Sequence, residues 1–206
     1  MYKVFVNYKE IILTASAPKS AKAKVLALDK TPFTKIIRIL KTTKAQKLYL
    51  THHDPDSLIH LFKQKIPVTT AGGGVVRNQK NELLFIFRKK KWDLPKGRIE
   101  KKESLEAGAK REVKEETGVK KLHVGALAGK TFHVFKRNNR YQLKETYWFY
   151  METTYDGKLV PEFKEDISKA VWKNYKKTKK ALGKTYPNIN YLFEKTALLK
   201  SLFEQE

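Results

Sequence analysis

The stretch GRIEKKESLEAGAKREVKEETGV, residues 97–119, holds six of the 21 acidic residues of a 206-residue chain whose formal net charge is +23. In a helix, Glu112, Glu115 and Glu116 would stand at i, i+3 and i+4 and therefore share one face. Like charges at this spacing destabilise a helix by roughly 0.2–0.5 kcal/mol per pair, and the macrodipole disfavours anions near the C-terminal end. We therefore expect this face to bind a cation, and oxygen ligands without His or Cys favour Mg²⁺ or Mn²⁺.

The residues around the cluster follow a defined spacing. Gly97 is followed after five residues by Glu103, and after seven more by REVKEETGV, residues 111–119. This spacing matches the Nudix box, G-x5-E-x7-R-E-U-x-E-E-x-G-U with U aliphatic, at every defined position. The chain thus resembles the Nudix hydrolases over residues 67–206, and the segments WDLPKG and TYWFYM fit the same family. The resemblance implies an α/β fold, the Nudix α/β/α sandwich with a mixed sheet and a loop–helix–loop metal site.

The resemblance also implies roles for the glutamates. Carried over to this sequence, it makes Glu112, Glu115 and Glu116 the metal ligands, with the carbonyl group of Gly97 completing the coordination. One of the three glutamates is also expected to activate water, and which of them serves as the general base stays open.

Four more residues receive roles from the resemblance. Glu103 and Arg111 are expected to support catalysis by forming an ion pair that braces the loop against the helix. Family members often take an additional carboxylate from a later loop. In the segment PEFKEDI the candidates are Glu162 and Glu165.

Positive side chains near the cluster are candidates for binding substrate phosphates, because cations stabilise the charge that develops during pyrophosphate cleavage. The alternative for each is an ordinary surface cation. Trp92, in the loop before the metal site, is the tryptophan favoured to stack on a base, although large aromatic residues more often belong to the core. The phosphate-binding candidates are Arg77, Arg88, Lys96, Arg98 and Lys144.

Composition narrows the class of protein. A hydrophobic content of 41% with 12% aromatic residues is typical of a folded globular chain. The chain has no cysteine, which excludes disulfides and thiolate metal sites. No signal peptide and no apolar run long enough to span a membrane is recognisable, so we expect a cytoplasmic protein without a membrane partner.

Two segments are predicted along the chain, divided at Ile66-Pro67. Residues 1–66 are expected to form a small α/β subdomain whose role is open. It could regulate the enzyme or form the interface of a homodimer. Residues 67–206 are expected to form the Nudix domain, with a Pro/Gly loop over 92–98. In this second segment we predict strands over 69–77, 82–88, 124–127, 131–136 and 145–153, and helices over 105–117, 165–180 and 188–204.

Together these features predict a Mg²⁺-dependent pyrophosphohydrolase that cleaves a diphosphate linkage in a nucleoside diphosphate-linked or polyphosphorylated small molecule. Dinucleoside polyphosphates or diphosphoinositol polyphosphates are favoured, because WDLPKGRIE with KETYWFYM resembles members that cleave them and because positive charge attracts highly charged ligands. Oxidised nucleoside triphosphates, ADP-ribose and capped RNA stay open.

A protein of another class is the alternative: a Nudix-fold nucleic-acid-binding or regulatory protein that grips its partner with a basic surface. Residues 1–66 carry 13 Lys and Arg against 4 Asp and Glu, and such an excess attracts polyanions. A degenerate Nudix box would favour this alternative, and the box in this chain is intact.

Overall fold

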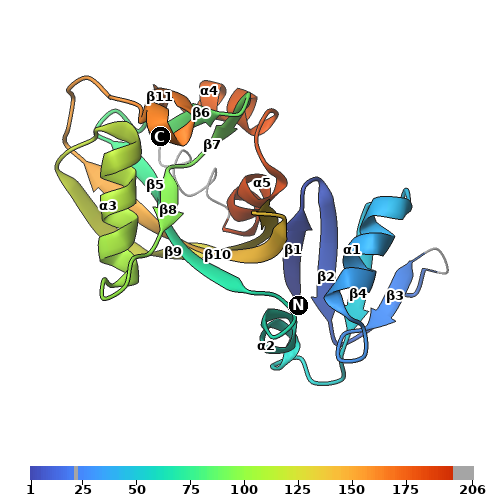
Figure 1. Ribbon diagram of the computed structural model, residues 1–206. Coiled ribbons are helices and arrows are strands. Elements are labelled where there is room, and N and C mark those ends of the chain that lie inside the picture. The colour runs from blue at the N-terminus through green and yellow to red at the C-terminus, as the bar shows by residue number, and fades with distance from the viewer. Residues whose placement is uncertain (21–22, 197–206) are drawn as a thin grey trace. The chain divides into compact units, whose positions relative to one another are not determined.

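The computed structural model describes residues 1–20 and 23–196, and the chain divides into two compact units (Figure 1). The division predicted from the sequence, 1–66 and 67–206, differs from these units because it leaves residues 132–144 in the second segment. Unit 1 comprises Met1–Thr69 with Phe132–Lys144, and unit 2 comprises Thr70–Thr131 with Glu145–Glu206.

Unit 1 is a small α/β unit built on a sheet. The first two strands form an antiparallel hairpin, and β4 pairs in parallel with both β2 and β3. Residues 132–134 pair in parallel with β1, so a segment far along the sequence also joins this sheet. The elements of this unit are β1 (Tyr2–Val6), β2 (Lys9–Thr14), β3 (Lys24–Ala27), α1 (Phe33–Thr42), β4 (Lys47–Thr51) and α2 (Leu58–Lys63).

The core of unit 1 explains why residues 132–144 belong to it. Strand residues such as Ile11 and Leu48 are fully buried, and they share one cluster with Leu40 of α1. Val134 and Leu143 are buried in that same cluster. Burial of apolar surface is the main force that holds such a unit together, so these two residues anchor the late segment in it.

Unit 2 carries the Nudix box. Its strands follow the order β11-β6-β5-β10-β9, with β7 paired to β6 and β8 paired to β5. The sheet of the whole chain is mixed, as predicted: parallel pairs join β1 to β9 and β4 to β2 and β3, whereas β11 pairs antiparallel with β6. The strands are β5 (Val68–Asn78), β6 (Leu83–Arg88), β7 (Lys91–Asp93), β8 (Lys96–Arg98), β9 (Leu122–Arg137), β10 (Arg140–Thr153) and β11 (Ile167–Lys173). The helices are α3 (Leu105–Thr117), α4 (Tyr175–Leu182) and α5 (Pro187–Lys195), with a 3-10 turn at Phe163–Glu165.

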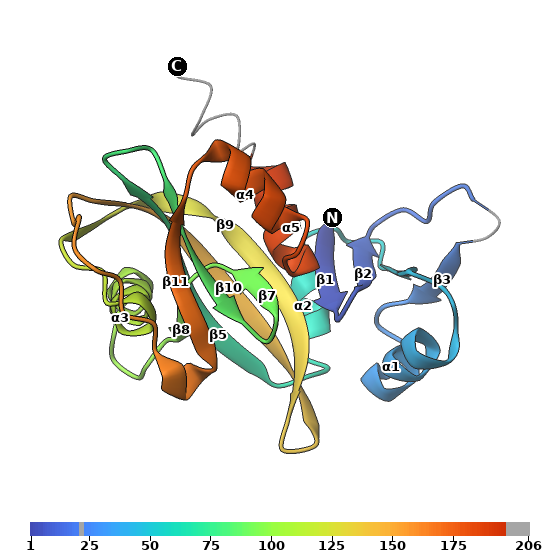
Figure 2. The ribbon, with the colours of Figure 1, turned by 90° about the horizontal axis from the view of Figure 1, so that it is seen from above.

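Alternation along the strands of unit 2 separates two cores. Val76 and Leu84 point to the face covered by α3 and pack with Val113, whereas the neighbouring Val75 and Phe85 point to the face covered by α4 and α5. Adjacent strand residues face opposite sides of a sheet, so each face needs its own helical cover. Figure 2 shows α3 on one side of these strands and α4 with α5 on the other. This is the expected α/β/α sandwich.

Glycines in β5 allow α3 to lie close to the sheet. A Cβ atom on Gly72 would stand 2.9 Å from the Cβ of Ala109, and one on Gly74 would stand 2.9 Å from Val113 Cγ2. Both separations are shorter than ordinary van der Waals contact. The backbone of β5 is therefore the surface on which this helix rests.

Three predictions about the second segment were wrong. The first half of the predicted helix 165–180 is strand β11, which pairs antiparallel with the edge of β6, so tertiary pairing outweighs local helix propensity. Residues 124–127 and 131–136 belong to one strand, β9, because pairing continues through the residues between them. The loop 92–98 contains the short strands β7 and β8, which pair with β6 and β5.

The predicted helix 188–204 is present as α5, and its residues beyond 196 lie outside the described part of the chain. Within the residues that the structure describes, no helix is long and apolar enough to cross a membrane.

Candidate active site

The helix of the box is fixed at both ends by local interactions. The hydroxyl group of Ser104 accepts a hydrogen bond from the backbone N–H of Ala107, which satisfies a donor at the first turn. Gly118 ends the helix with φ of 69°, a left-handed conformation that favours glycine. The bounds of α3, Leu105–Thr117, confirm the helix predicted over 105–117.

An ion pair ties the loop to the helix. The guanidinium group of Arg111 donates from Nη2 to Glu103 Oε1 at 2.8 Å and from Nε to Glu103 Oε2 at 3.2 Å. Arg111 Nη2 also donates to the carbonyl oxygen of Arg98 at 3.0 Å, and Glu103 Oε1 accepts from the N–H of Glu100. This two-point pairing holds the pKa of Glu103 below its usual value and fixes residues 98–103 against α3.

Glu112 lies directly against Gly97. A Cβ atom on Gly97 would overlap the Glu112 carboxylate, since even the farther oxygen of that group would be 2.7 Å away. The glycine therefore makes room for the carboxylate beside its own backbone. Burial raises the pKa of Glu112, although the hydrogen bond from Arg111 opposes the shift.

Glu116 is the most buried carboxylate of the site, with 2% of its surface exposed. Its Oε2 accepts a hydrogen bond from the backbone N–H of Lys96 at 2.9 Å, and its Oε1 lies 3.8 Å from Arg88 Nη1. Burial raises the pKa of Glu116 to about 7, against the favourable charges of Lys96 and Arg88. Such perturbed carboxylates are concentrated at functional sites.

Glu115 is the most exposed of the three helix glutamates. Arg111 Nη1 donates to Glu115 Oε2 at 2.8 Å and to Glu112 Oε1 at 2.9 Å, so one guanidinium group holds both carboxylates. Among the residues that the structure describes, no three His, Asp or Glu side chains are gathered as a complete set of metal ligands. The groups around Gly97 are nevertheless carboxylate and carbonyl oxygens, a donor set that fits a hard divalent cation.

The two candidates for an additional carboxylate lie beside the end of α3. The backbone N–H of Glu162 donates to the carbonyl oxygen of Glu116 at 3.2 Å, and that of Val160 donates to Thr117 at 2.8 Å. The negative charge of Glu165 contributes to the raised pKa of Glu112. The segment that follows β10 is thus bonded to the helix that carries the glutamates.

Two of the five basic candidates contact the glutamates through their own atoms. Arg88 approaches Glu116 with its guanidinium group, whereas Lys96 reaches that carboxylate with its backbone N–H. The side-chain Nζ of Lys96 lies 2.7 Å from Asp93 Oδ2. The carbonyl oxygen of Arg98 accepts a hydrogen bond from Arg111, and Arg98 itself is exposed.

The structure does not bring the other candidates to the glutamates. Arg77 pairs with Glu152 at 2.6 Å and lines a separate pocket of about 380 Å³. Lys144 belongs to unit 1, where its Nζ lies 5.3 Å from the ring centre of Phe135. The Nζ of Lys173 lies over the ring of Trp92, 3.5 Å from its centre, and this ring packs against the core of unit 2.

Asp93 is a site residue that the sequence analysis missed. It is 4% exposed and forms an ion pair with the buried Nζ of Lys96, and its Oδ1 accepts from the N–H of Leu94. Its negative charge also raises the pKa of Glu116. The signal was available in WDLPKG, where an acid stands three residues before the lysine that contacts the box.

Comparisons with known proteins concern the region that contains this site. Residues 68–193, more than half of the chain, match the family model described as NUDIX domain. The MutT protein of Methanosarcina mazei Go1 is 24% identical, with a TM-score of 0.50 over 65% of this chain and 95% of that chain. The Ap4A hydrolase of C. elegans is 17% identical, with a TM-score of 0.51 over 66% of this chain and 99% of that chain. Both likenesses concern the fold.

The match of residues 68–193 to the NUDIX domain model supports a hydrolase that acts on pyrophosphate bonds, and the braced loop and the glutamate-bearing helix on one face of the sheet fit that class. The chain belongs to the Nudix family.

Proposed function

We propose that this chain is a Mg²⁺-dependent pyrophosphohydrolase whose metal ligands are Glu112, Glu115, Glu116 and the carbonyl group of Gly97. The observation that carries the proposal is the placement of the Glu112 carboxylate against Gly97, in a box whose loop and helix are tied by Arg111. Three carboxylates on one helix face, with two of them largely buried, favour a cation at that face.

The chemistry follows from the charges. A pyrophosphate resists attack by hydroxide because it is itself negatively charged. A bound divalent cation would neutralise the phosphate oxygens and lower the pKa of the water that it coordinates. Water adds to phosphorus, the bridging P–O bond breaks, and the water proton passes to a base, which we assign to one of the helix glutamates. Arg88 and Lys96 place positive charge beside Glu116, where it can attract the phosphates of a substrate.

The substrate class we favour is a dinucleoside polyphosphate or a diphosphoinositol polyphosphate. The support is the segment from Trp92 to Arg98 and the net charge of +23, which attracts ligands with several phosphates. The C. elegans neighbour is called an Ap4A hydrolase, a name consistent with this preference, although at 17% identity the likeness is one of fold. Oxidised nucleoside triphosphates, ADP-ribose and capped RNA are the competing substrates.

The test is a phosphate-release screen with Mg²⁺ over these substrate classes. Glu115→Gln and Glu116→Gln are expected to lower kcat/KM by about 100-fold or more, the usual cost of losing one group of a metal-assisted site. Glu106→Gln is the matched control, because Glu106 is an exposed glutamate in the first turn of the same helix and should leave turnover unchanged. Absence of metal-dependent turnover on every class, or equal turnover in all three variants, would refute the proposal.

A further inference from the structure

Positive charge is concentrated in unit 1, the unit that lacks the Nudix box. Its sequence carries 17 Lys and Arg against 4 Asp and Glu, a net charge of +13 over 82 residues. Unit 2 carries 27 against 17, a net charge of +10 over 124 residues. The catalytic site therefore does not account for the larger share of the positive charge.

Unit 1 also contains a pocket of about 560 Å³, a volume usual for small-ligand sites. Its walls come from the turn between β1 and β2, from α1 and from residues 134–141 of the β9–β10 hairpin. The apolar side chains Ile37, Leu40 and Val134 line it and are each no more than 6% exposed. The pocket therefore has an apolar floor that belongs to the core of the unit.

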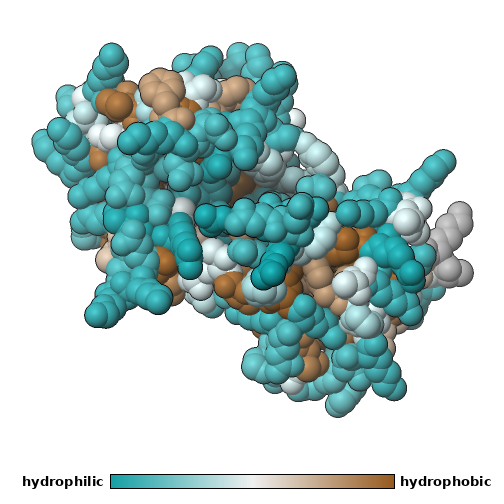
Figure 3. Space-filling model, viewed as in Figure 1, coloured by the Kyte–Doolittle hydropathy of each residue, from teal (hydrophilic) through white to brown (hydrophobic). Residues whose placement is uncertain are grey.

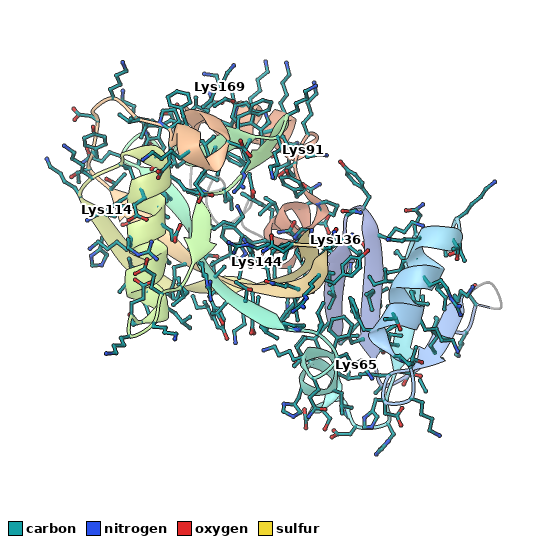
Figure 4. The ribbon with its side chains drawn as sticks, in the orientation of Figure 1. Lys65, Lys91, Lys114, Lys136, Lys144 and Lys169 are labelled. Carbon is teal, nitrogen blue, oxygen red and sulfur yellow. The ribbon has the colours of Figure 1, made fainter. Side chains whose placement is uncertain are left out.

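Among the described residues, the side chains that line the pocket around that floor include cations and no carboxylates. Within the described residues, the charged side chains that line the pocket are Lys9, Lys41 and Lys136. Lys9 is held by the carbonyl oxygens of Leu40 and Thr43 at the end of α1. Lys41 and Lys136 are exposed, and Figure 4 shows Lys136 on the β9–β10 hairpin together with Lys144.

Aromatic rings complete the lining. Tyr8, in the β1–β2 turn, is 60% exposed, and Phe135 and Tyr141 contribute from the hairpin. The Nζ of Lys41 lies 5.6 Å from the centre of the Tyr141 ring. Figure 3 shows brown, apolar side chains among the hydrophilic ones on the face of unit 1 in view, over α1 and the neighbouring strands.

We propose that this pocket binds a nucleotide of a single-stranded nucleic acid, with the base against the aromatic and apolar lining and the phosphates on Lys41 and Lys136. Stacking platforms beside lysines are the chemistry by which proteins hold single strands. A polymer is favoured over a free nucleotide because the positive charge continues past the pocket. Arg137 and Arg140 are exposed on the same hairpin, one and four residues after Lys136.

This proposal goes beyond hydrolysis and does not depend on it, because the pocket lies wholly in unit 1. Binding is measured by fluorescence anisotropy of a labelled single-stranded RNA of about 12 nucleotides, with the full chain in EDTA so that no divalent cation is available. The Lys41→Ala/Lys136→Ala variant is expected to lose tenfold or more in affinity. Each phosphate contact to a single strand contributes about 0.7 to the salt slope, so the slope should fall by about 1.4.

The matched control is Lys24→Ala/Lys35→Ala, which removes the same charge from exposed lysines of unit 1 outside the pocket. It should keep the affinity within about threefold. Tyr8→Ala should lose at least about fivefold through lost stacking, whereas Tyr8→Phe retains the ring and the affinity. Phosphate release by the Lys41→Ala/Lys136→Ala variant from small substrates should be unchanged.

Three outcomes would overturn the proposal. Equal losses in both double variants would mean that only diffuse charge attracts RNA. Equal binding in the wild type and in Lys41→Ala/Lys136→Ala would remove the pocket from the interaction. Binding of ATP at the pocket without binding of the oligonucleotide would replace the polymer by a free nucleotide.

Discussion

Gly97→Ala tests whether the position of Glu112 controls catalysis. The added methyl group would occupy the place of the Glu112 carboxylate, because both carboxylate oxygens would lie within 2.7 Å of it. The carboxylate must move by more than an ångström to reach ordinary contact, and a misplacement of about 1 Å costs about 100-fold in rate. We therefore expect kcat/KM to fall by about 100-fold, which corresponds to about 2.7 kcal/mol.

The same substitution should change stability little. The atoms that the methyl group meets belong to the end of the Glu112 side chain, which Arg111 also binds, and a shifted rotamer costs about 0.5–1.5 kcal/mol. Replacing glycine also restricts the unfolded chain, which offsets about 0.4–1 kcal/mol of that cost. The free energy of unfolding should therefore stay within about 1 kcal/mol of the wild type.

The assay pairs Mg²⁺-dependent phosphate release with urea denaturation of the same samples. Gly125→Ala is the control: its Cβ would meet its nearest neighbour at 3.4 Å, an ordinary contact, so rate and stability should both be retained. Gly97→Ala with kcat/KM within about threefold of the wild type would refute the assignment of the Gly97–Glu112 pair to catalysis.

Three further predictions concern stability, each measured by denaturant unfolding. Arg111 lowers the pKa of Glu103 below its ordinary 4.5, so the ion pair stabilises the fold fully above that value and loses this effect as the pH falls. Between about pH 5 and 3, Glu103→Gln should therefore lose less stability than the wild type. Parallel losses in the two proteins would contradict this. Asp93→Asn leaves Lys96 buried without its partner and should cost about 3 kcal/mol, part of which Lys96→Met should restore in the double variant; additive losses would disprove the pairing. Gly73→Ala places a methyl group 2.7 Å from a backbone carbonyl oxygen and from a buried tryptophan ring, so it should cost about 2 kcal/mol, and wild-type stability would contradict that crowding.

The parts of the site that the sequence predicted are those set by local spacing. Helix α3 spans Leu105–Thr117, as predicted, because its caps, Ser104 and Gly118, act on residues only a few positions away. The Glu103–Arg111 ion pair was expected from the resemblance to the Nudix family, and the structure contains it. The like charges at i, i+3 and i+4 indicated a cation-binding face, and the match of the box to a known family added the expected ligand role of Glu112, Glu115 and Glu116.

The parts that the sequence did not predict depend on distant partners. Strand β11 pairs with the edge of β6, which lies more than 70 residues earlier, and its own residues do not identify that partner. The hairpin residues 132–144 join unit 1 through burial of Val134 and Leu143, which local patterns cannot assign to one core or another. Arg77 and Glu152 are likewise brought together only by the sheet.

The glycines of β5 have a consequence for engineering. Because α3 rests on the backbone of β5 at Gly72 and Gly74, the strand contributes no side chain to this contact, and its spacing depends on the small residues Ala109 and Val113 of the helix. Random libraries that include residues 72–74 should consist mostly of inactive proteins, whereas libraries in the loop around Glu162 leave this support intact. Strand β5 thus fixes the position of the helix that carries the glutamates, and substitutions that change substrate preference should be sought in loops such as the one around Glu162.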